Sequence, residues 1–250
     1  KKRRFSLENK PRASYDHIWL GAYDDTVEDA IISPEWFDAC IDADKKLGFE
    51  ARGVEIVAHD PSDTGPDAKG LAYRHGVIIK DVQIRQFGDI NQGADWAISY
   101  AQDIKPEVFI WDGDGMGAGL RRQASLAFNG TKTDYDMFKG SLSGKGQNNA
   151  EQKYLQDFGD PMKAKTYMET FLNNRAQFYK LLADRMYNTY RCVVRGDYVD
   201  PNDMLSLDSD GIENMKGLRA QLCRIPKVAN NRGLIQIMNK KEMKADGINS

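Results

Sequence analysis

Two strand-like segments that each end on an aspartate constrain this chain more than any other feature. "VEIVAHD" ends on Asp60 and "VFIWD" ends on Asp112, and each then enters a turn, "PSDTG" or "GDGMG". Because side chains alternate along a strand, each aspartate shares a face with the apolar residues two and four positions before it. If the two strands are neighbours, we expect both carboxylates to meet at one edge of a sheet.

The segments around these acids predict an α/β fold. Ser33 as N-cap and Pro34 at the first position begin a helix that we expect to end at Gly48. A buried strand follows at 52–60, and "GLAYRHGVIIKDVQIRQF" predicts two antiparallel strands that meet near Gly76. Further along we expect a helix at 91–105, the strand at 108–112 and a helix at 117–128. The order of three strands, helix, strand and helix is typical of an α/β layer plan.

The second half of the chain is predicted to be mainly helical. A Gly-, Ser- and Asn-rich stretch at 138–152 predicts a mobile loop, and an apolar stripe predicts one long helix over 161–190. We expect another helix at 208–223, a short hairpin formed by 224–228 and 233–239, and a last helical turn from 240. We expect the apolar stripe of the helix at 161–190 to belong to the hydrophobic core rather than to a functional site.

Composition excludes several classes of protein. The chain has 250 residues, with 35 basic and 37 acidic residues and a formal net charge of -2. The overall charge therefore does not indicate a nucleic-acid-binding protein, although it is compatible with a local basic patch. The three cysteines have no CxxC spacing and predict free thiols, and we expect neither a signal peptide nor a membrane span.

The paired aspartates favour a metal site. Two ionised carboxylates side by side repel each other, and a divalent cation between them removes the conflict. Oxygen ligands favour Mg²⁺ or Mn²⁺ and suit phosphoryl chemistry with two ions. The alternative is that Asp60 and Asp112 only cap turns. We interpret Asp63 and Asp114 as turn residues or as residues that support the metal ligands. His59 faces away from Asp60 along the strand, so we expect its imidazole to be packed in the core.

Other glycine motifs favour competing functions. Gly113, Gly115 and Ala118 satisfy GxGxxA, but the neighbouring aspartates would repel a dinucleotide pyrophosphate. "GSLSGKG" lacks the spacing of a phosphate-binding loop. "DPSDTG" also suits the phosphate turn of an actin-like nucleotide-binding domain, and only the missing nucleotide-binding motifs argue against that class.

Taken together, the motifs resemble one known family. "HIWLGAY", "IISPEWFDACIDA", "VAHDPSDTGPDAKGLAYRHG", "VFIWDGDGMGAGL", "FKGS" and "GLIQIMNKKEMKADGINS" resemble the C-terminal nuclease domain of the terminase large subunit of tailed bacteriophages. The resemblance runs from about residue 15 to the end. It implies an RNase H-like α/β fold, with a mixed central sheet and helices on both faces.

The resemblance implies a metal-dependent endonuclease that cuts concatemeric viral DNA by a two-metal-ion mechanism. Asp60 and Asp112 match the family's first two metal-binding acids, with Mg²⁺ or Mn²⁺ as cofactor. The family's third acid normally follows a segment that would begin just after Ser250, so we expect the third ligand to be cut off or absent. Asp210 and Asp246 are substitutes that the spacing supports only weakly.

The resemblance also implies partners and a location. We expect residues 1–33 to be a linker from an absent N-terminal ATPase domain and 34–250 to be the nuclease domain, truncated at its C-terminal end. Double-stranded viral DNA, the terminase small subunit and the portal are the implied partners, in the cytoplasm of the infected bacterial host. The residues expected to contact DNA are basic: Arg121, Arg122, Lys132, Lys139 and Lys145. A non-catalytic DNA- or portal-docking module is the alternative function.

Overall fold

The computed structural model describes residues 30–155, 161–228, 230–246 and 248. Most of the expected linker at 1–33 therefore lies outside the described residues. The part that is described, residues 30–33, lies against the C-terminal part of the chain, because Ala30 forms an antiparallel bridge with Pro226. The backbone N–H of Ile31 donates to the carbonyl of Ile225 at 3.0 Å.

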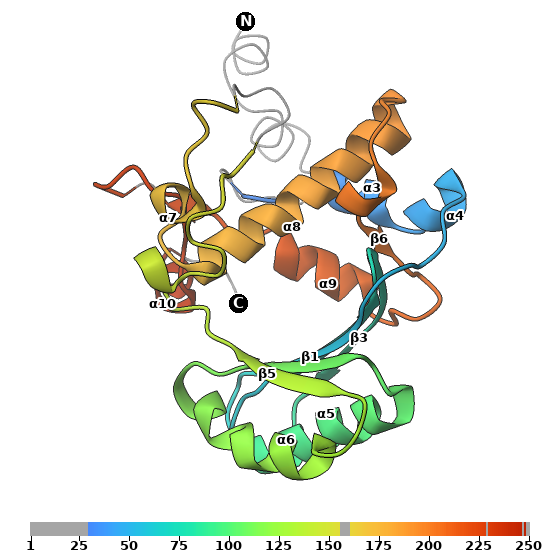
Figure 1. The fold of residues 1–250 in the computed structure, drawn as a ribbon, viewed down its shortest axis with the longest axis vertical. Helices are drawn as coiled ribbons and strands as arrows, with labels where there is room; N and C mark the ends of the chain where they lie inside the picture. Colours follow the sequence, from blue (N-terminus) through green and yellow to red (C-terminus); the bar gives the residue numbers. More distant parts are fainter. Residues whose placement is uncertain (1–29, 156–160, 229, 247, 249–250) are drawn as a thin grey trace, which may run out of the picture.

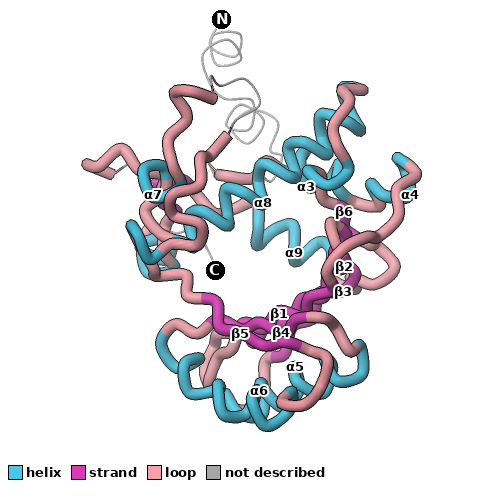
Figure 2. The backbone as a smooth tube through the Cα atoms, viewed as in Figure 1, coloured by secondary structure: helices cyan, strands magenta, loops and turns pink. Residues whose placement is uncertain are grey.

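A six-stranded mixed sheet forms the centre of the molecule (Figures 1 and 2). Its strands, in spatial order, are β5 (Asp134–Phe138), β4 (Val108–Asp112), β1 (Glu55–Asp60), β2 (Lys69–His75), β3 (Ile78–Arg85) and β6 (Ser206–Leu207). β1, β2 and β3 form an antiparallel meander, whereas β4 lies parallel to β1 and β5 parallel to β4. This is the RNase H-like arrangement that the family resemblance implies.

Helices cover both faces of the sheet (Figure 1). The main helices are α3 (Pro34–Cys40), α4 (Ala43–Leu47), α5 (Ile90–Ile104), α6 (Arg121–Phe128), α7 (Tyr167–Thr170), α8 (Asn174–Tyr190), α9 (Met215–Leu222) and α10 (Lys240–Ala245). α5 and α6 lie on one face, and α8 and α9 lie over the other. No helix in the described ranges is long and apolar enough to cross a membrane.

Each face has its own hydrophobic core. The core between the sheet and α5/α6 contains Val57, Leu71, Ala94, Ala97, Ile98, Ala101, Phe109, Trp111, Leu120, Ala124 and Phe128. The core on the α8/α9 side contains Ile32, Phe37, Cys40, Ala183, Met186, Leu205, Leu207, Ile212 and Cys223. A fixed sheet between two packed layers holds the strand ends in place.

Two helices predicted as continuous are interrupted. The predicted helix at 33–48 breaks because the backbone N–H of Asp42 donates to the Leu207 carbonyl at 2.9 Å. The predicted helix at 161–190 breaks because Phe171 bridges to Ile235. A new N-cap at Asn173 then starts α8. In both places, pairing with a distant segment overrides the helical pattern.

Further differences lie at the edges of the sheet. β5 and the two-residue β6 were not predicted as strands. The predicted helix at 117–128 begins as a 3₁₀ segment, Gly115–Leu120, before α6. The C-terminal hairpin is present as β7 (Lys227–Val228) and β8 (Gln236–Ile237).

Candidate metal centre

The two strand-ending aspartates lie next to each other. β1 and β4 pair in parallel, with His59 opposite Trp111, and Asp60 and Asp112 are the next residue on each strand. Neighbouring strands lie about 4.8 Å apart. Because Val57, His59 and Trp111 are buried on the α5/α6 side, strand alternation places both aspartates on the opposite face, toward α8. The structure therefore brings the two predicted ligands together at the carboxyl edge of the sheet.

The turn after β4 fixes the conformation of Asp112. Its Oδ1 accepts a hydrogen bond from the backbone N–H of Asp114 at 2.9 Å. On the buried side, the indole N–H of Trp111 donates to the Gly117 carbonyl at 2.8 Å. A Cβ on Gly117 would lie 1.9 Å from the carbonyl oxygen of Asp112, so the chain can fold back here only at glycine. Asp112 is half-buried, and one of its carboxylate oxygens is oriented by this turn.

Asp60 lies opposite a glycine on β2. Its pairing partner is Gly70, and a Cβ at that glycine would lie 3.5 Å from the Asp60 Cβ. Asp60 itself is exposed at the strand end. An added Cβ would thus be in ordinary van der Waals contact with Asp60, so the backbone geometry does not require glycine here.

His59 is a packed imidazole on the opposite face of the sheet. It is 3% exposed, its Nδ1 lies 2.9 Å from the Gly70 carbonyl, and its ring lies edge-on to Trp96 at 6.2 Å. Burial lowers the pKa of His59 below 6.5, and the nearby Lys69 ammonium lowers it further against the effect of the Gly70 carbonyl. The neutral ring therefore donates from Nδ1, and it does not face Asp60.

Asp63 and Asp114 support the loops around the metal-site pair. Oδ1 of Asp63 accepts from the backbone N–H of Ile90 at 3.2 Å, which ties the loop after β1 to the start of α5. Both carboxylate oxygens of Asp114 bind Ser141, at 2.8 Å from its N–H and 2.7 Å from its hydroxyl. These contacts agree with the interpretation of both residues as turn supports.

The start of α8 lies over the carboxyl edge. Phe138, the pairing partner of Asp112 on β5, forms an edge-to-face contact with Phe178 of α8 at 5.1 Å. Arg175 belongs to the first turn of α8, and its backbone N–H donates to the Gly140 carbonyl at 2.9 Å. This helix therefore brings a cation to the end of β5, beside the metal-site pair.

Tyr179 of α8 connects this helix electrostatically with the metal-site pair. Burial raises the pKa of Tyr179 to about 12, the cations Arg175 and Arg224 act in the opposite direction, and the Asp60 carboxylate raises it further. Asp60 and the two arginines thus each lie within electrostatic range of Tyr179. Neither Arg175 nor Tyr179 was predicted as a site residue. Their only signal in the sequence is that they are polar residues on a helix with an apolar stripe.

The two carboxylates supply part of the ligand set that a hard divalent cation requires. Across the described residues, no group of three or more His, Cys, Asp or Glu side chains is placed to hold a metal. Asp210 is ion-paired with Lys45 at 2.8 Å and follows β6, the strand at the far side of the sheet. The backbone N–H of Asp246 donates to Glu242 at 3.0 Å at the end of α10. The donor set in this structure is therefore a pair, to which one further oxygen ligand would have to be added.

Solved structures of one viral nuclease domain are similar to this chain over most of its length. The nuclease domain of the large terminase subunit gp2 of bacterial virus Sf6 is 49% identical, covers 86% of this chain and 90% of its own, and superposes with a TM-score of 0.76. Its K428A mutant with manganese and beta-thujaplicinol is 48% identical, with coverages of 88% and 92% and a TM-score of 0.78. The same mutant with calcium is also 48% identical, with coverages of 86% and 91% and a TM-score of 0.79.

This chain belongs to the family of terminase large-subunit nuclease domains. Searches of protein-family models and of curated proteins gave no match. The similarity confirms the family resemblance and the RNase H-like fold. It also decides against the dinucleotide-binding and actin-like interpretations of the glycine turns.

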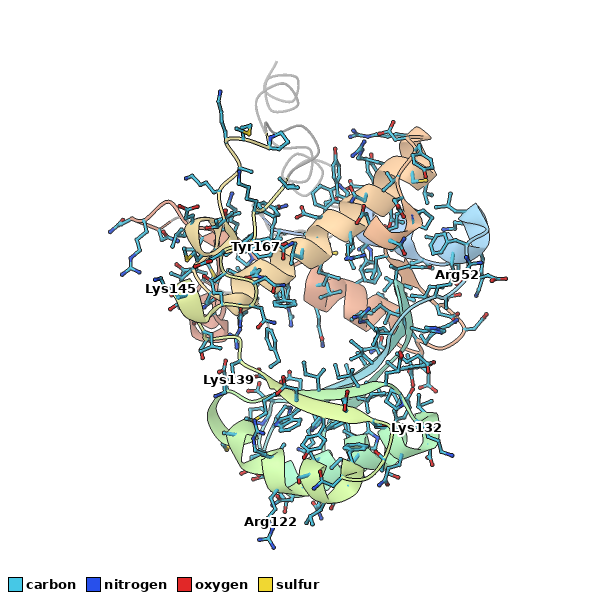
Figure 3. The ribbon with its side chains drawn as sticks, viewed as in Figure 1. Arg52, Arg122, Lys132, Lys139, Lys145 and Tyr167 are labelled. Carbon is cyan, nitrogen blue, oxygen red and sulfur yellow. The ribbon has the colours of Figure 1, made fainter. Side chains whose placement is uncertain are left out.

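The predicted DNA-contacting residues of this terminase nuclease domain lie on different sides of the molecule (Figure 3). Lys139 directly follows β5 at the carboxyl edge, and Lys145 lies in the loop above it. Lys132 lies near the other end of β5, and Arg122, next to Arg121 in α6, points away from the sheet. Lys139 and Lys145 are therefore the members of the set that lie on the side of the metal-site pair.

Proposed function

We propose that this chain is a Mg²⁺- or Mn²⁺-dependent endonuclease domain that cleaves double-stranded viral DNA during genome packaging. The observation that carries the proposal is the parallel pairing of β1 and β4, which brings Asp60 and Asp112 side by side on one face. A shared cation explains two strand-ending carboxylates that would otherwise repel each other.

Asp60 and Asp112 would hold the cation between their carboxylates. When bound, Mg²⁺ or Mn²⁺ supplies Lewis-acid polarisation of the scissile phosphate and lowers the pKa of a coordinated water. Manganese and calcium in structures of the similar Sf6 domain support a divalent cation here. We extend the proposal to two ions, with a third oxygen ligand supplied from outside the donor pair.

The protein's own groups orient the reactants. The Asp114 N–H holds one oxygen of Asp112, and the other oxygen would bind the cation. Positive charge beside the carboxyl edge comes from Lys139 and Lys145 (Figure 3) and from Arg175, whose backbone N–H donates to Gly140 just after β5. These residues would bind phosphates without reading bases. In the described part of the chain, Arg175 forms no ion pair, so its guanidinium is available for a phosphate.

The family supports a place for this activity in packaging. The proposed substrate is concatemeric viral DNA in the cytoplasm of the infected host. The proposed partners are the terminase small subunit, the portal and an ATPase domain joined through residues 1–33. Residues 34–250 would form the nuclease domain.

Plasmid nicking in Mn²⁺ tests the proposal. We expect Asp60→Asn and Asp112→Asn each to abolish nicking, because each removes a charged ligand. Asp103→Asn is the matched control, since this exposed residue of α5 also loses one negative charge away from the pair. Unchanged nicking by both variants would refute the role of Asp60 and Asp112, whereas no nicking by wild-type protein would support a non-catalytic docking module.

A further inference from the structure

An open groove lies at the junction of β3 and α5. Its volume is about 510 Å³, within the range of roughly 300–1,000 Å³ that is usual for small-ligand sites. The residues that line it are Arg85, Phe87, Gly88, Gln92, Asp95 and Trp96. None of them belongs to the metal centre described above.

The groove presents a rigid aromatic surface to solvent. The Arg85 guanidinium lies 4.5 Å from the centroid of the Phe87 ring and 5.8 Å from that of Trp96. Phe87 is nonetheless 68% exposed. Cation–π contacts of this kind hold a ring in position. Phe87 is thus an oriented ring with an accessible surface rather than part of the core.

The groove and the metal centre share the carboxyl edge of the sheet but lie on its opposite faces, because Arg85 contacts Trp96 of α5 whereas Asp60 and Asp112 face α8. Gly70 of β2 pairs with Asp60 on one side and with Ile84 on the other, and Arg85 follows Ile84. Two strand spacings separate the backbones by about 10 Å, and the thickness of the sheet adds to this. A DNA strand that passes over the carboxyl edge, at about 3.4 Å per nucleotide, would therefore reach the groove more than about three nucleotides from the cut. The loop after β1 also touches the start of α5, through the contact of Asp63 with Ile90.

The charges of the groove disfavour a phosphate as its occupant. Asp95 lines it, and Asp89 caps the adjacent end of α5, so two carboxylates stand against the single cation Arg85. A flat, neutral ring with polar edges suits two aromatic side chains, a guanidinium and a carboxylate. A nucleobase has these properties, but only when it is unpaired and out of the stack.

We propose that this groove binds one unpaired nucleobase of DNA that passes over the carboxyl edge of the sheet, by stacking it on Phe87 and Arg85. The inference rests on the proposed function, because it assumes DNA across the carboxyl edge. It adds a preference for locally opened DNA near the cleavage position.

The test compares two labelled duplexes that differ by a single unpaired adenine. Binding is measured by fluorescence anisotropy in EDTA, so that no cleavage is needed. Wild-type protein is expected to bind the bulged duplex more tightly, and Phe87→Ala to lose roughly 5- to 150-fold on that duplex alone, as a lost base stack predicts. Phe87→Trp should retain the preference, because it keeps an aromatic ring.

Two control variants make substitutions of the same kinds outside the groove. Leu126→Ala removes an exposed apolar side chain (76% exposed) from α6. Arg85→Ala should also weaken binding of the bulged duplex alone. Its control is Arg52→Ala, at an exposed arginine just before β1 (Figure 3). Neither control should change the ratio of the two affinities.

Three outcomes would overturn the inference. The first is that wild-type protein binds the two duplexes with equal affinity. The second is that Phe87→Ala weakens binding of both duplexes equally. The third is that Phe87→Ala changes the mass of the protein in solution and leaves DNA binding unchanged. The last outcome would mark a surface for a second protein chain. Because binding is read without metal, a failed nuclease assay leaves this test intact. Nicking of paired DNA by Phe87→Ala tests the nuclease proposal separately.

Discussion

Replacement of Asp112 by asparagine gives two opposite effects on thermal stability, depending on metal. Without metal, the variant loses the repulsion between two carboxylates on adjacent strands. At about 4.8 Å this repulsion is about 0.9 kcal/mol in water and about 3.5 kcal/mol at an effective dielectric constant of 20. Asp60 is exposed and Asp112 is half-buried, so the aqueous value is the better guide. We expect the Tm of Asp112→Asn to be unchanged or higher by about 2–4 °C.

With Mn²⁺ the order reverses. A cation at 100 times its Kd stabilises the folded state by about 2.7 kcal/mol, which raises Tm by about 5–10 °C for a domain of this size. Wild-type protein should show this rise, and Asp112→Asn should show little of it. Differential scanning calorimetry with and without Mn²⁺ measures both effects, with Asp103→Asn as the control that keeps the full rise. An equal rise for Asp112→Asn and wild type would refute the shared-cation site.

Three further predictions concern packing, the turn after β4 and pH. Phe171→Ala, at a fully buried ring, should lower the free energy of unfolding by about 3–5 kcal/mol in urea titrations, against about 1 kcal/mol for Phe178→Ala at a 41% exposed ring. Equal losses of unfolding free energy for the two variants would contradict the assignment of Phe171 to the hydrophobic core. Gly117→Ala should abolish nicking and destabilise the turn, because its Cβ meets backbone at 1.9 Å, whereas Gly119→Ala has nothing within 4 Å and should stay active. Burial lowers the folded-state pKa of His59, so the unfolded chain binds the proton more readily and stability falls as pH drops below about 6.5, by up to ~1.4 kcal/mol per pH unit. His59→Gln should lack this part of the loss when urea midpoints at about pH 5 and pH 7.5 are compared, and an identical acid dependence would contradict the assignment.

The central strands could be predicted because local pattern and tertiary role agree there. β1 and β4 lie in the middle of the sheet, and their inward residues, such as Val57, Phe109 and Trp111, are apolar. β5 was not predicted because it lies at the edge of the sheet, where Asp134 and Asp136 are exposed. These polar residues interrupt the apolar pattern by which a strand is recognised. A strand of this kind is defined by its backbone pairing with β4.

The helix boundaries that failed depend on distant partners. The break at Ile41–Asp42 exists because Leu207 pairs with this segment, and Leu207 lies more than 160 residues away in the chain. Phe171 leaves the helical path because it pairs with Ile235. Helical periodicity holds up to these points and carries no information on the partner.

The same distinction applies to the site. Asp60 and Asp112 could be predicted because a carboxylate at the end of a buried strand is visible in the sequence itself. Arg175, Tyr179 and the groove at Phe87 are visible only when α8 crosses the sheet and α5 packs beneath it. Lys132 shows the converse, since its position in the chain is close to Lys139 but β5 separates them in space (Figure 3).

The most direct test of the shared cation is the anomalous difference map of a Mn²⁺-soaked crystal. The shared-site interpretation predicts a manganese peak between Asp60 and Asp112, about 2.1 Å from an oxygen of each carboxylate, as expected for a small hard cation. No peak at this edge, or carboxylates turned away from each other with manganese bound elsewhere, would contradict it.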